Sequence, residues 1–203
     1  MKAFMNVMVF LMISMPLFSD SIVDPSVSVK RTSEKAFSLQ VSNAVNEEVQ
    51  VSIIDGYGEI VYSHRFVDEK DISRTYNLTK LPEGDYSLNV EKPQSLWIQP
   101  LAIEAGMLQI QEQALKTVFK PTIRAHEDLV DFDLLCPVNS EVKIRIFDES
   151  EEKPLYTETL ETEGSLQKRF NLSQLEDGHY LMDVQINDGD QTFAFRKTIE
   201  LEK

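Results

Sequence analysis

The stretch that decides the fold is NEEVQVSIID at residues 46–55, which recurs as NSEVKIRIFD at residues 139–148. A second stretch, YNLTKLPEGDYSLNV at residues 76–90, recurs as FNLSQLEDGHYLMDV at residues 170–184. Aligned with one inserted residue, the two halves of the chain share twelve identical residues in the same order. Self-similarity at one fixed offset is typical of a duplicated domain. The sequence therefore predicts two copies of one structural unit.

The expected domains are residues 22–106 and residues 107–203, joined by a connection at about residues 104–117. Domains of this size bury only about 60–65% of the surface of the extended chain, so each is marginally stable alone. The connection is more apolar than a free linker, and we expect it to be packed. Its apolar residues are Met107, Leu108, Ile110, Leu115 and Phe119.

Within each copy, apolar residues alternate with polar ones, as where Val49, Val51 and Ile53 are separated by Gln50 and Ser52. A period of two is typical of half-buried strands. No long helical pattern is present, although residues 111–116 could form one or two helical turns. About seven strands per copy predict an all-β fold of two tandem immunoglobulin-like antiparallel β-sandwich domains. In the second copy we expect strands at residues 118–123, 129–135, 141–147, 154–160, 167–172, 179–186 and 192–201.

The motif L-x-x-G-x-Y places Tyr86 and Tyr180 just after a tight turn in the two copies. This is the setting of a tyrosine corner, in which the tyrosine hydroxyl bonds to backbone upstream. Antibody domains carry a cysteine two residues later, where this chain has Leu88 and Met182. Apolar packing is therefore expected to replace the disulfide of an antibody domain.

Residues 1–21 have the order of a secretory signal peptide: a cation at Lys2, an apolar run of about 12 residues, then small and polar residues. The run is shorter than the roughly 20 residues that span a bilayer. Cleavage is expected before Ile22 or after Ser19. The mature protein is expected to be exported to the periplasm, the cell surface or the medium, with no integral membrane span.

The chain has a formal net charge of −14, because 34 acidic residues outnumber 20 basic ones. Such a field disfavours nucleic acid and anionic membrane surfaces as partners. The second copy is the more acidic one, so a cationic partner would favour it. The single cysteine excludes an internal disulfide.

The motifs V-x-I-x-D-x-x-G-x-x-V-Y at residues 51–62 and N-L-x-x-L-P-x-G-x-Y at residues 77–86 carry a family resemblance. The sequence resembles small tandem immunoglobulin-like domains of unknown function in secreted Bacteroidetes proteins. It is also similar to the C-terminal sorting domain of type IX secretion cargo. The resemblance implies export and a β-sandwich, and it implies no catalytic residue. The second copy departs from it, since Glu176 replaces Pro82 and residues 151–154 replace the glycine turn.

No catalytic, cofactor-binding or metal-binding residue is assigned. His64, His126 and His179 show no metal-ligand spacing, and no G-x-S-x-G nucleophile motif occurs. We therefore expect no enzyme and no cofactor. Acidic groups at residues 68–71, 148–152 and 188–190 do not match a calcium loop, and we interpret them as solvated turns.

Four other residues are interpreted structurally, each with a functional alternative. Cys136 follows two leucines and should be a buried small hydrophobe, although an intermolecular disulfide is the alternative. Trp97 should belong to the core, the alternative being a platform for sugar. Asn77 and Asn171 open formal glycosylation sequons, but their equivalent positions favour a role in the backbone.

The first functional hypothesis is a non-enzymatic binding or scaffold protein of the bacterial envelope. It would contact a protein, or alternatively a glycan, through sandwich loops or an edge strand. The second is a sorting function in a type IX-like pathway, with the last copy recognised by the export machinery; deleting residues 196–203 would test it. The third is a hydrolase with a site between the copies. The oligomeric state is left open.

Overall fold

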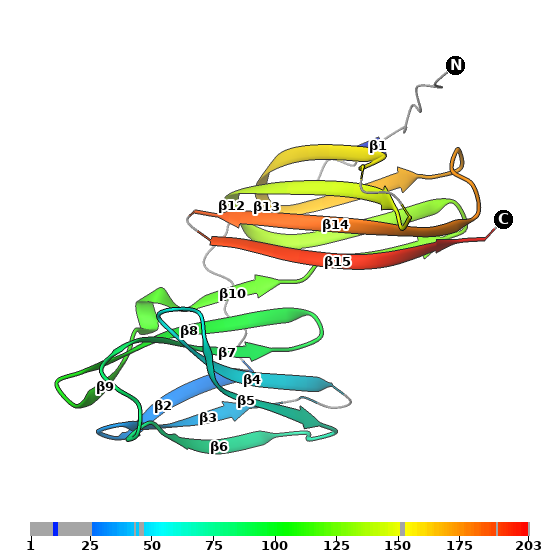
Figure 1. The fold of residues 1–203 in the computed structure, drawn as a ribbon. Coiled ribbons are helices and arrows are strands. Elements are labelled where there is room, and N and C mark those ends of the chain that lie inside the picture. The colour runs from blue at the N-terminus through cyan, green and yellow to red at the C-terminus, as the bar shows by residue number, and fades with distance from the viewer. Residues whose placement is uncertain are drawn as a thin grey trace. The chain divides into compact units, whose positions relative to one another are not determined.

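The computed structural model describes residues 10–11, 26–42, 44, 47–150, 153–189 and 191–202. It consists of antiparallel strands and one short 3-10 turn, which confirms the all-β prediction (Figure 1). The chain divides into two compact units, residues 21–118 and residues 119–203, the second including strand β1 (Phe10–Leu11). Apart from β1, the signal peptide expected at residues 1–21 lies outside the described residues.

The first unit consists of two antiparallel sheets. One sheet has the order β2-β3-β6, formed by β2 (Val27–Ser33), β3 (Ala36–Val41) and β6 (Ile72–Asn77). The other contains the order β8-β7-β4-β5, formed by β4 (Glu48–Asp55), β5 (Ile60–Val67), β7 (Gly84–Glu91) and β8 (Ser95–Glu104). The three strands of the first sheet and these four of the six strands in the other match the predicted immunoglobulin-like sandwich.

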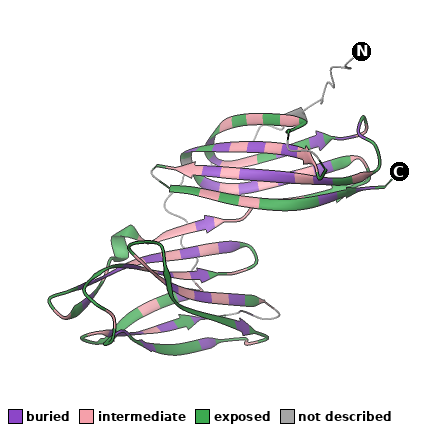
Figure 2. Cartoon of the chain, in the orientation of Figure 1, coloured by how far each residue is buried: buried purple, intermediate pink, exposed green. Residues whose placement is uncertain are grey.

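The core of the first unit comes from the alternation seen in the sequence. Every second residue of β4 and β7 is buried, and Figure 2 shows this banding along the strands. These side chains pack against Phe37 and Leu39 of β3, which are fully buried. Removing apolar surface from water contributes about 25 cal/mol per Å², so this shared core holds the two sheets together.

The connection between the copies belongs to the first unit. Strand β9 (Met107–Ile110) pairs with β8, the turn η1 (Glu112–Ala114) follows, and β10 (Lys116–Phe119) also lies beside β8. Leu108 is fully buried, and Ile110 and Leu115 pack against the core of this unit. The division therefore falls after Val118 rather than after Gly106, because the apolar connection covers the edge of β8.

The second unit reaches a similar arrangement with fewer, longer strands. They are β11 (Thr122–His126), β12 (Leu129–Asp148), β13 (Tyr156–Asn171), β14 (Gly178–Asp188) and β15 (Gln191–Leu201). The first part of β12 pairs with β11 and with the last part of β13. The last part of β12 pairs with the first part of β13 and with β14, which in turn pairs with β15.

Three of the strand boundaries predicted for the second copy are wrong. Residues 129–135 and 141–147 form one strand, because register shifts on either side of Val138 let pairing continue around the bend. Residues 154–160 and 167–172 likewise belong to the single strand β13. The strand expected at residues 118–123 is instead divided between β10 and β11, since Pro121 has no N–H to donate.

Within the described part of the chain, no helix has the length and apolar character needed to cross a membrane.

Candidate functional site

The three histidines singled out by the sequence do not meet in one site. His64 lies on β5, His126 ends β11 and His179 lies on β14, and all three are exposed. Among the described residues, no three His, Cys, Asp or Glu side chains are arranged to hold a metal ion.

Cys136 and Trp97 both lie in cores, as predicted. The Cys136 thiol is buried and donates a hydrogen bond to Oγ1 of Thr162 at 3.2 Å, and Thr162 donates to the carbonyl of Pro137. Burial raises the pKa of the Cys136 thiol, which disfavours the reactive thiolate. Trp97 is 2% exposed and belongs to the core of the first unit.

The asparagines of the two sequons are exposed polar residues between inward apolar ones, as expected, and their side chains also bond to the backbone. The side-chain oxygen of Asn77 accepts a hydrogen bond from the N–H of Thr79 at 2.9 Å. Asn171 accepts one from the N–H of Ser173 at the same distance. Each asparagine therefore closes a turn after its strand, which accounts for its recurrence in both copies.

The acidic turns are partly engaged in local contacts. Oδ1 of Asp148 accepts hydrogen bonds from the N–H and the hydroxyl of Ser150, and these lower the pKa of Asp148. Glu69 pairs with Arg74 at 3.0 Å. Glu151, Glu152 and Asp190, also named in these groups, lie outside the described residues.

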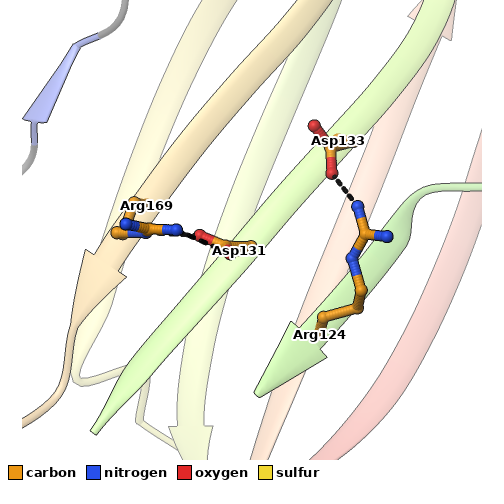
Figure 3. A network of polar contacts seen from close by, with 4 residues as sticks. All are labelled: Arg124, Asp131, Asp133 and Arg169. Carbon is orange, nitrogen blue, oxygen red and sulfur yellow. Dashed lines mark hydrogen bonds and ion pairs between the residues drawn. The ribbon is translucent and has the colours of Figure 1, made fainter. Parts of the chain in front are cut away.

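A ladder of ion pairs crosses β11, β12 and β13 of the second unit (Figure 3). Arg124 pairs with Asp133 at 2.7 Å, and Arg169 pairs with Asp131 through two hydrogen bonds of 2.5 and 2.9 Å. The hydrogen bonds from Arg169 lower the pKa of Asp131. Because each charge already has an opposite partner, this face resembles a solvated sheet surface rather than a binding site.

Strand β5 of the first unit differs from the other strands in its exposed apolar residues. Ile60 is 60% exposed and Val67 is 56% exposed, and Val61 and Tyr62 between them are also exposed. Tyr57, in the turn that precedes the strand, is almost fully exposed. Apolar side chains gathered on one edge strand are typical of a surface that meets a partner.

A groove of about 440 Å³ lies between β5 and β6, beside these exposed residues. Its lining combines apolar, aromatic and cationic side chains. The residues lining it are Ile53, Val61, Tyr62, His64, Phe66, Arg74, Thr75, Tyr76, Asn77, Leu78, Lys80 and Leu81.

Aromatic rings form the middle of the groove. Tyr76 stacks on Phe37 with ring centroids 5.1 Å apart, and Tyr62 meets Tyr76 edge to face at 5.2 Å. His64 meets Phe66 edge to face at 4.5 Å. The Tyr76 hydroxyl is buried and makes no hydrogen bond of ordinary geometry with the described residues. Burial raises its pKa, and the neighbouring Tyr62 adds to this effect.

The charge of the groove is opposite to that of the chain. Its lining includes Arg74 and Lys80 and no aspartate or glutamate, although the chain carries a net charge of −14. The guanidinium of Arg74 lies over the ring of Phe66, 5.2 Å from the centroid. Arg74 is paired with Glu69, which lies outside the lining, so Lys80 and the remaining N–H donors of Arg74 are the cationic groups next to the apolar surface. They suit a ligand with both acidic and apolar groups.

The second unit carries the equivalent residues, but there they are bonded to one another. Lys168, at the position of Arg74, is buried and pairs with Glu158 at 2.5 Å. Glu158 stands where the first unit has His64, and it also accepts a hydrogen bond from the Tyr156 hydroxyl. Burial, together with this hydrogen bond, raises the pKa of Tyr156. The two copies therefore diverge at this place: an internal network satisfies the polar groups of one, and the other has an open groove.

Sequence reasoning did not find this groove. In the sequence, Tyr62 is only the last residue of the motif at residues 51–62, and no motif includes Arg74. Two signals could have indicated it: the consecutive apolar residues Ile60, Val61 and Tyr62, and the exchange of His64 for Glu158 between the copies.

Residues 33–104 match the family described as the secretion system C-terminal sorting domain. The resemblance recognised in the motifs is thus confirmed, and it falls within the first unit, which contains the groove. A sorting domain of this kind implies that the protein is exported. No curated protein matches the chain.

Solved structures that align with the chain have low identity. A two-domain fibronectin type III segment of chicken tenascin is 9% identical, with 86% of this chain and 97% of that chain covered and a TM-score of 0.33. A β-glucuronidase of Parabacteroides merdae is 12% identical over 83% of this chain and 28% of its own, with a TM-score of 0.35. The BSP domain of a biofilm associated protein is 15% identical, with 87% of this chain and 29% of that chain covered and a TM-score of 0.27. Likenesses at this level carry no information about function.

Proposed function

We propose that this exported protein is a non-enzymatic binding protein that holds a partner in the groove between β5 and β6 of its first unit. The observation that carries the proposal is the divergence between the copies. Arg74 is exposed at the groove, whereas its counterpart Lys168 is buried in an ion pair with Glu158. A position that only stabilised the sandwich would not need an exposed cation beside exposed apolar residues.

The edge position of β5 supports the same proposal. β-Sandwich proteins commonly bind through end loops or by adding a strand at an exposed edge. Proteins normally protect an edge strand with charged residues or a covering segment, since a bare edge invites pairing. Strand β5 carries the charged residue Arg65, but Ile60, Val61 and Val67 of the same strand expose apolar surface, which is consistent with an edge that is covered by a partner.

Site-directed photo-crosslinking in the producing cells tests this proposal. A photoreactive phenylalanine analogue is placed at Tyr62, and in a matched control at Tyr156, its counterpart in the second unit. We expect a covalent adduct from position 62, its loss when Arg74→Glu is added, and no adduct from position 156. Failure to form an adduct at position 62, or equal adducts from both positions, would contradict the proposal.

A sorting function is the second candidate, and the match of residues 33–104 favours it. The match lies on the first copy, whereas the sequence-based hypothesis placed recognition in the last copy. The export assay should therefore compare two deletions, residues 196–203 and the whole of residues 119–203. If the first unit carries the sorting information, export should survive both deletions and should be lost when surface residues of the first unit are changed.

A further inference from the structure

We infer that the groove between β5 and β6 binds an extended acidic segment of a partner protein, which adds as a strand along β5. This inference rests on the proposed function and names the chemistry of its partner. Three features support it: the unpaired edge of β5, the charge of the groove lining and the contacts of its aromatic rings.

The edge of β5 is able to receive a strand. β5 pairs with β4 on one side, from Ile60 to Val67, and in the described part of the chain no strand pairs with its other side. The N–H and C=O groups on that side point outward in alternation, as a β-strand requires. An extended peptide would satisfy them by main-chain hydrogen bonds, which give affinity without a particular side-chain sequence.

The side chains of the groove would select which peptide binds. Successive residues of an added strand point to opposite faces, so every second residue would face the groove. There it would meet Arg74 and Lys80, with no carboxylate in the lining. An aspartate or glutamate at that position would gain charge-assisted hydrogen bonds, whereas a lysine would be repelled.

The present contacts of Arg74 show the same preference. Its Nη2 donates hydrogen bonds of 3.1 and 3.0 Å to the two carboxylate oxygens of Glu69, and its Nη1 donates one of 3.0 Å to the carbonyl of Ser73. A ligand carboxylate would bind to the N–H donors of this guanidinium that these bonds leave over.

The aromatic rings favour a peptide over a sugar. Sugars bind to proteins by stacking on free ring faces, but the rings here are largely engaged. One face of Tyr76 stacks on Phe37, and the Phe66 ring is covered by Arg74. What remains exposed is the apolar row along β5, which suits the aliphatic or aromatic side chains of a strand.

Fluorescence anisotropy of labelled peptides with the full chain tests the inference. The probe is a nine-residue peptide in which valine or tyrosine alternates with aspartate. One comparison peptide has lysine in place of aspartate. Another keeps the side chains of the acidic probe but is N-methylated at every second amide, so that one edge of the extended peptide has no N–H donors. Polyglucuronate serves as an anionic sugar competitor. The protein variants are Arg74→Gln, Lys80→Gln and the matched control Arg65→Gln. Arg65 lies on β5 and pairs with Glu48 of β4, but it does not line the groove.

We expect the acidic peptide to bind at least tenfold more tightly than the lysine peptide and the N-methylated peptide. Arg74→Gln should weaken binding about tenfold, as expected for loss of a charge-assisted contact. Lys80→Gln should weaken it about threefold, because a flexible exposed ammonium makes a weaker contact with a carboxylate than a planar guanidinium does. Arg65→Gln should leave binding unchanged.

Equal affinity for the acidic and the lysine peptide would overturn the inference. So would two results together: displacement of the acidic peptide by polyglucuronate, and an N-methylated peptide that binds as tightly as the unmethylated one. Absence of binding at millimolar peptide would overturn it too. Self-association of the chain that depends on Arg74 would assign the groove to a second copy instead. An adduct at position 62 in the crosslinking experiment, combined with no acidic-peptide binding, would leave the proposed function standing and remove only this inference.

Discussion

The hydroxyl of Tyr180 donates a hydrogen bond to the carbonyl oxygen of Glu176 at 2.9 Å, four residues upstream. In the first unit, Tyr86 makes the same bond to the carbonyl of Pro82 at 3.0 Å. Both tyrosines are buried, so each ring fixes the turn before its strand to the core below. These are the two tyrosine corners that the repeated motif predicts, and they form although proline in one copy is glutamate in the other.

Replacing Tyr180 by phenylalanine should therefore destabilise the second unit by about 0.5–1.5 kcal/mol, because one hydrogen bond is lost while the ring is kept. Tyr86→Phe should do the same in the first unit. Urea unfolding measures the change, with amide hydrogen exchange assigning it to a unit. Tyr57→Phe is the control, since Tyr57 is 96% exposed and should tolerate the change. Equal stability of Tyr180→Phe and the unaltered chain would argue against a stabilising corner.

The features that could be predicted from sequence are those that depend on local chemistry. The polar positions of Asn77 and Asn171, the corners at Tyr86 and Tyr180, and the alternation of β4 all involve residues close in sequence. Their recurrence at one offset made each prediction stronger, since two copies of a turn are unlikely to arise by chance.

The rest depended on contacts between distant residues. Whether residues 129–135 and 141–147 form one strand depends on pairing with β13 through the bend at Val138, which no local pattern encodes. The groove depends on how residues of β5 and β6 meet in the first unit. The different arrangement in the second unit depends on the contact between Glu158 and Lys168. The boundary after Val118 depends on β9 pairing back on β8.

Lys168 and Arg74 occupy equivalent positions but should respond differently to alanine. The Lys168 side chain is 1% exposed and pairs with Glu158, so Lys168→Ala leaves a half-buried carboxylate without its cation. We expect a loss of about 1–3 kcal/mol in the second unit. Arg74→Ala removes an exposed pair with Glu69, worth about 0–1 kcal/mol, and a cation–π contact with Phe66, worth about 0.5–1 kcal/mol.

Urea unfolding of both variants, with hydrogen exchange of β13 and β6, measures the contrast. Lys168→Met is the matched control, because it keeps the apolar length of the side chain and removes only the charge. If Arg74→Ala lowers the free energy of unfolding as much as Lys168→Ala does, our account is wrong, and Arg74 has a structural role in the first unit.

The ion pair between Asp131 and Arg169 should make the second unit sensitive to acid. The pKa of Asp131 is lowered in the folded chain, chiefly by hydrogen bonds from Arg169. A carboxyl of depressed pKa stabilises the fold fully above its unfolded value of about 3.9, and this contribution is lost as pH falls through the folded pKa. Asp131→Asn should therefore reduce the loss of stability below about pH 4.

Thermal unfolding between pH 3 and pH 7, with hydrogen exchange to identify the unit, checks this. Asp133→Asn offers a comparison, since Asp133 has one hydrogen bond from Arg124 rather than two from one guanidinium. If the Asp131→Asn chain loses as much stability on acidification as the unaltered chain, the ion pair between Asp131 and Arg169 does not contribute to the acid sensitivity of the second unit.

The Cys136 thiol should be inert in the native protein. It is buried, and its pKa is raised by burial, so at pH 8 both access and thiolate formation are disfavoured. A thiol-reactive disulfide reagent should label it slowly in buffer and rapidly in urea. Cys136→Ser should not abolish folding, since the hydroxyl can donate to Thr162 as the thiol does. Rapid native labelling, or a disulfide-linked dimer on non-reducing electrophoresis, would show that the thiol is accessible.

Ending the first unit at Gly106 should destabilise it, because the segment after Gly106 covers the edge of β8. That segment contributes β9, the fully buried Leu108, and a backbone hydrogen bond from the Leu108 N–H to the carbonyl of Glu34 at 2.6 Å. A chain of residues 22–106 should therefore unfold at lower urea than one of residues 22–118, and its open edge should promote aggregation. Leu108→Ala in the longer chain isolates the packing part, for which about 2–5 kcal/mol is expected. The same urea midpoint for both lengths would mean that residues 107–118 are a linker after all.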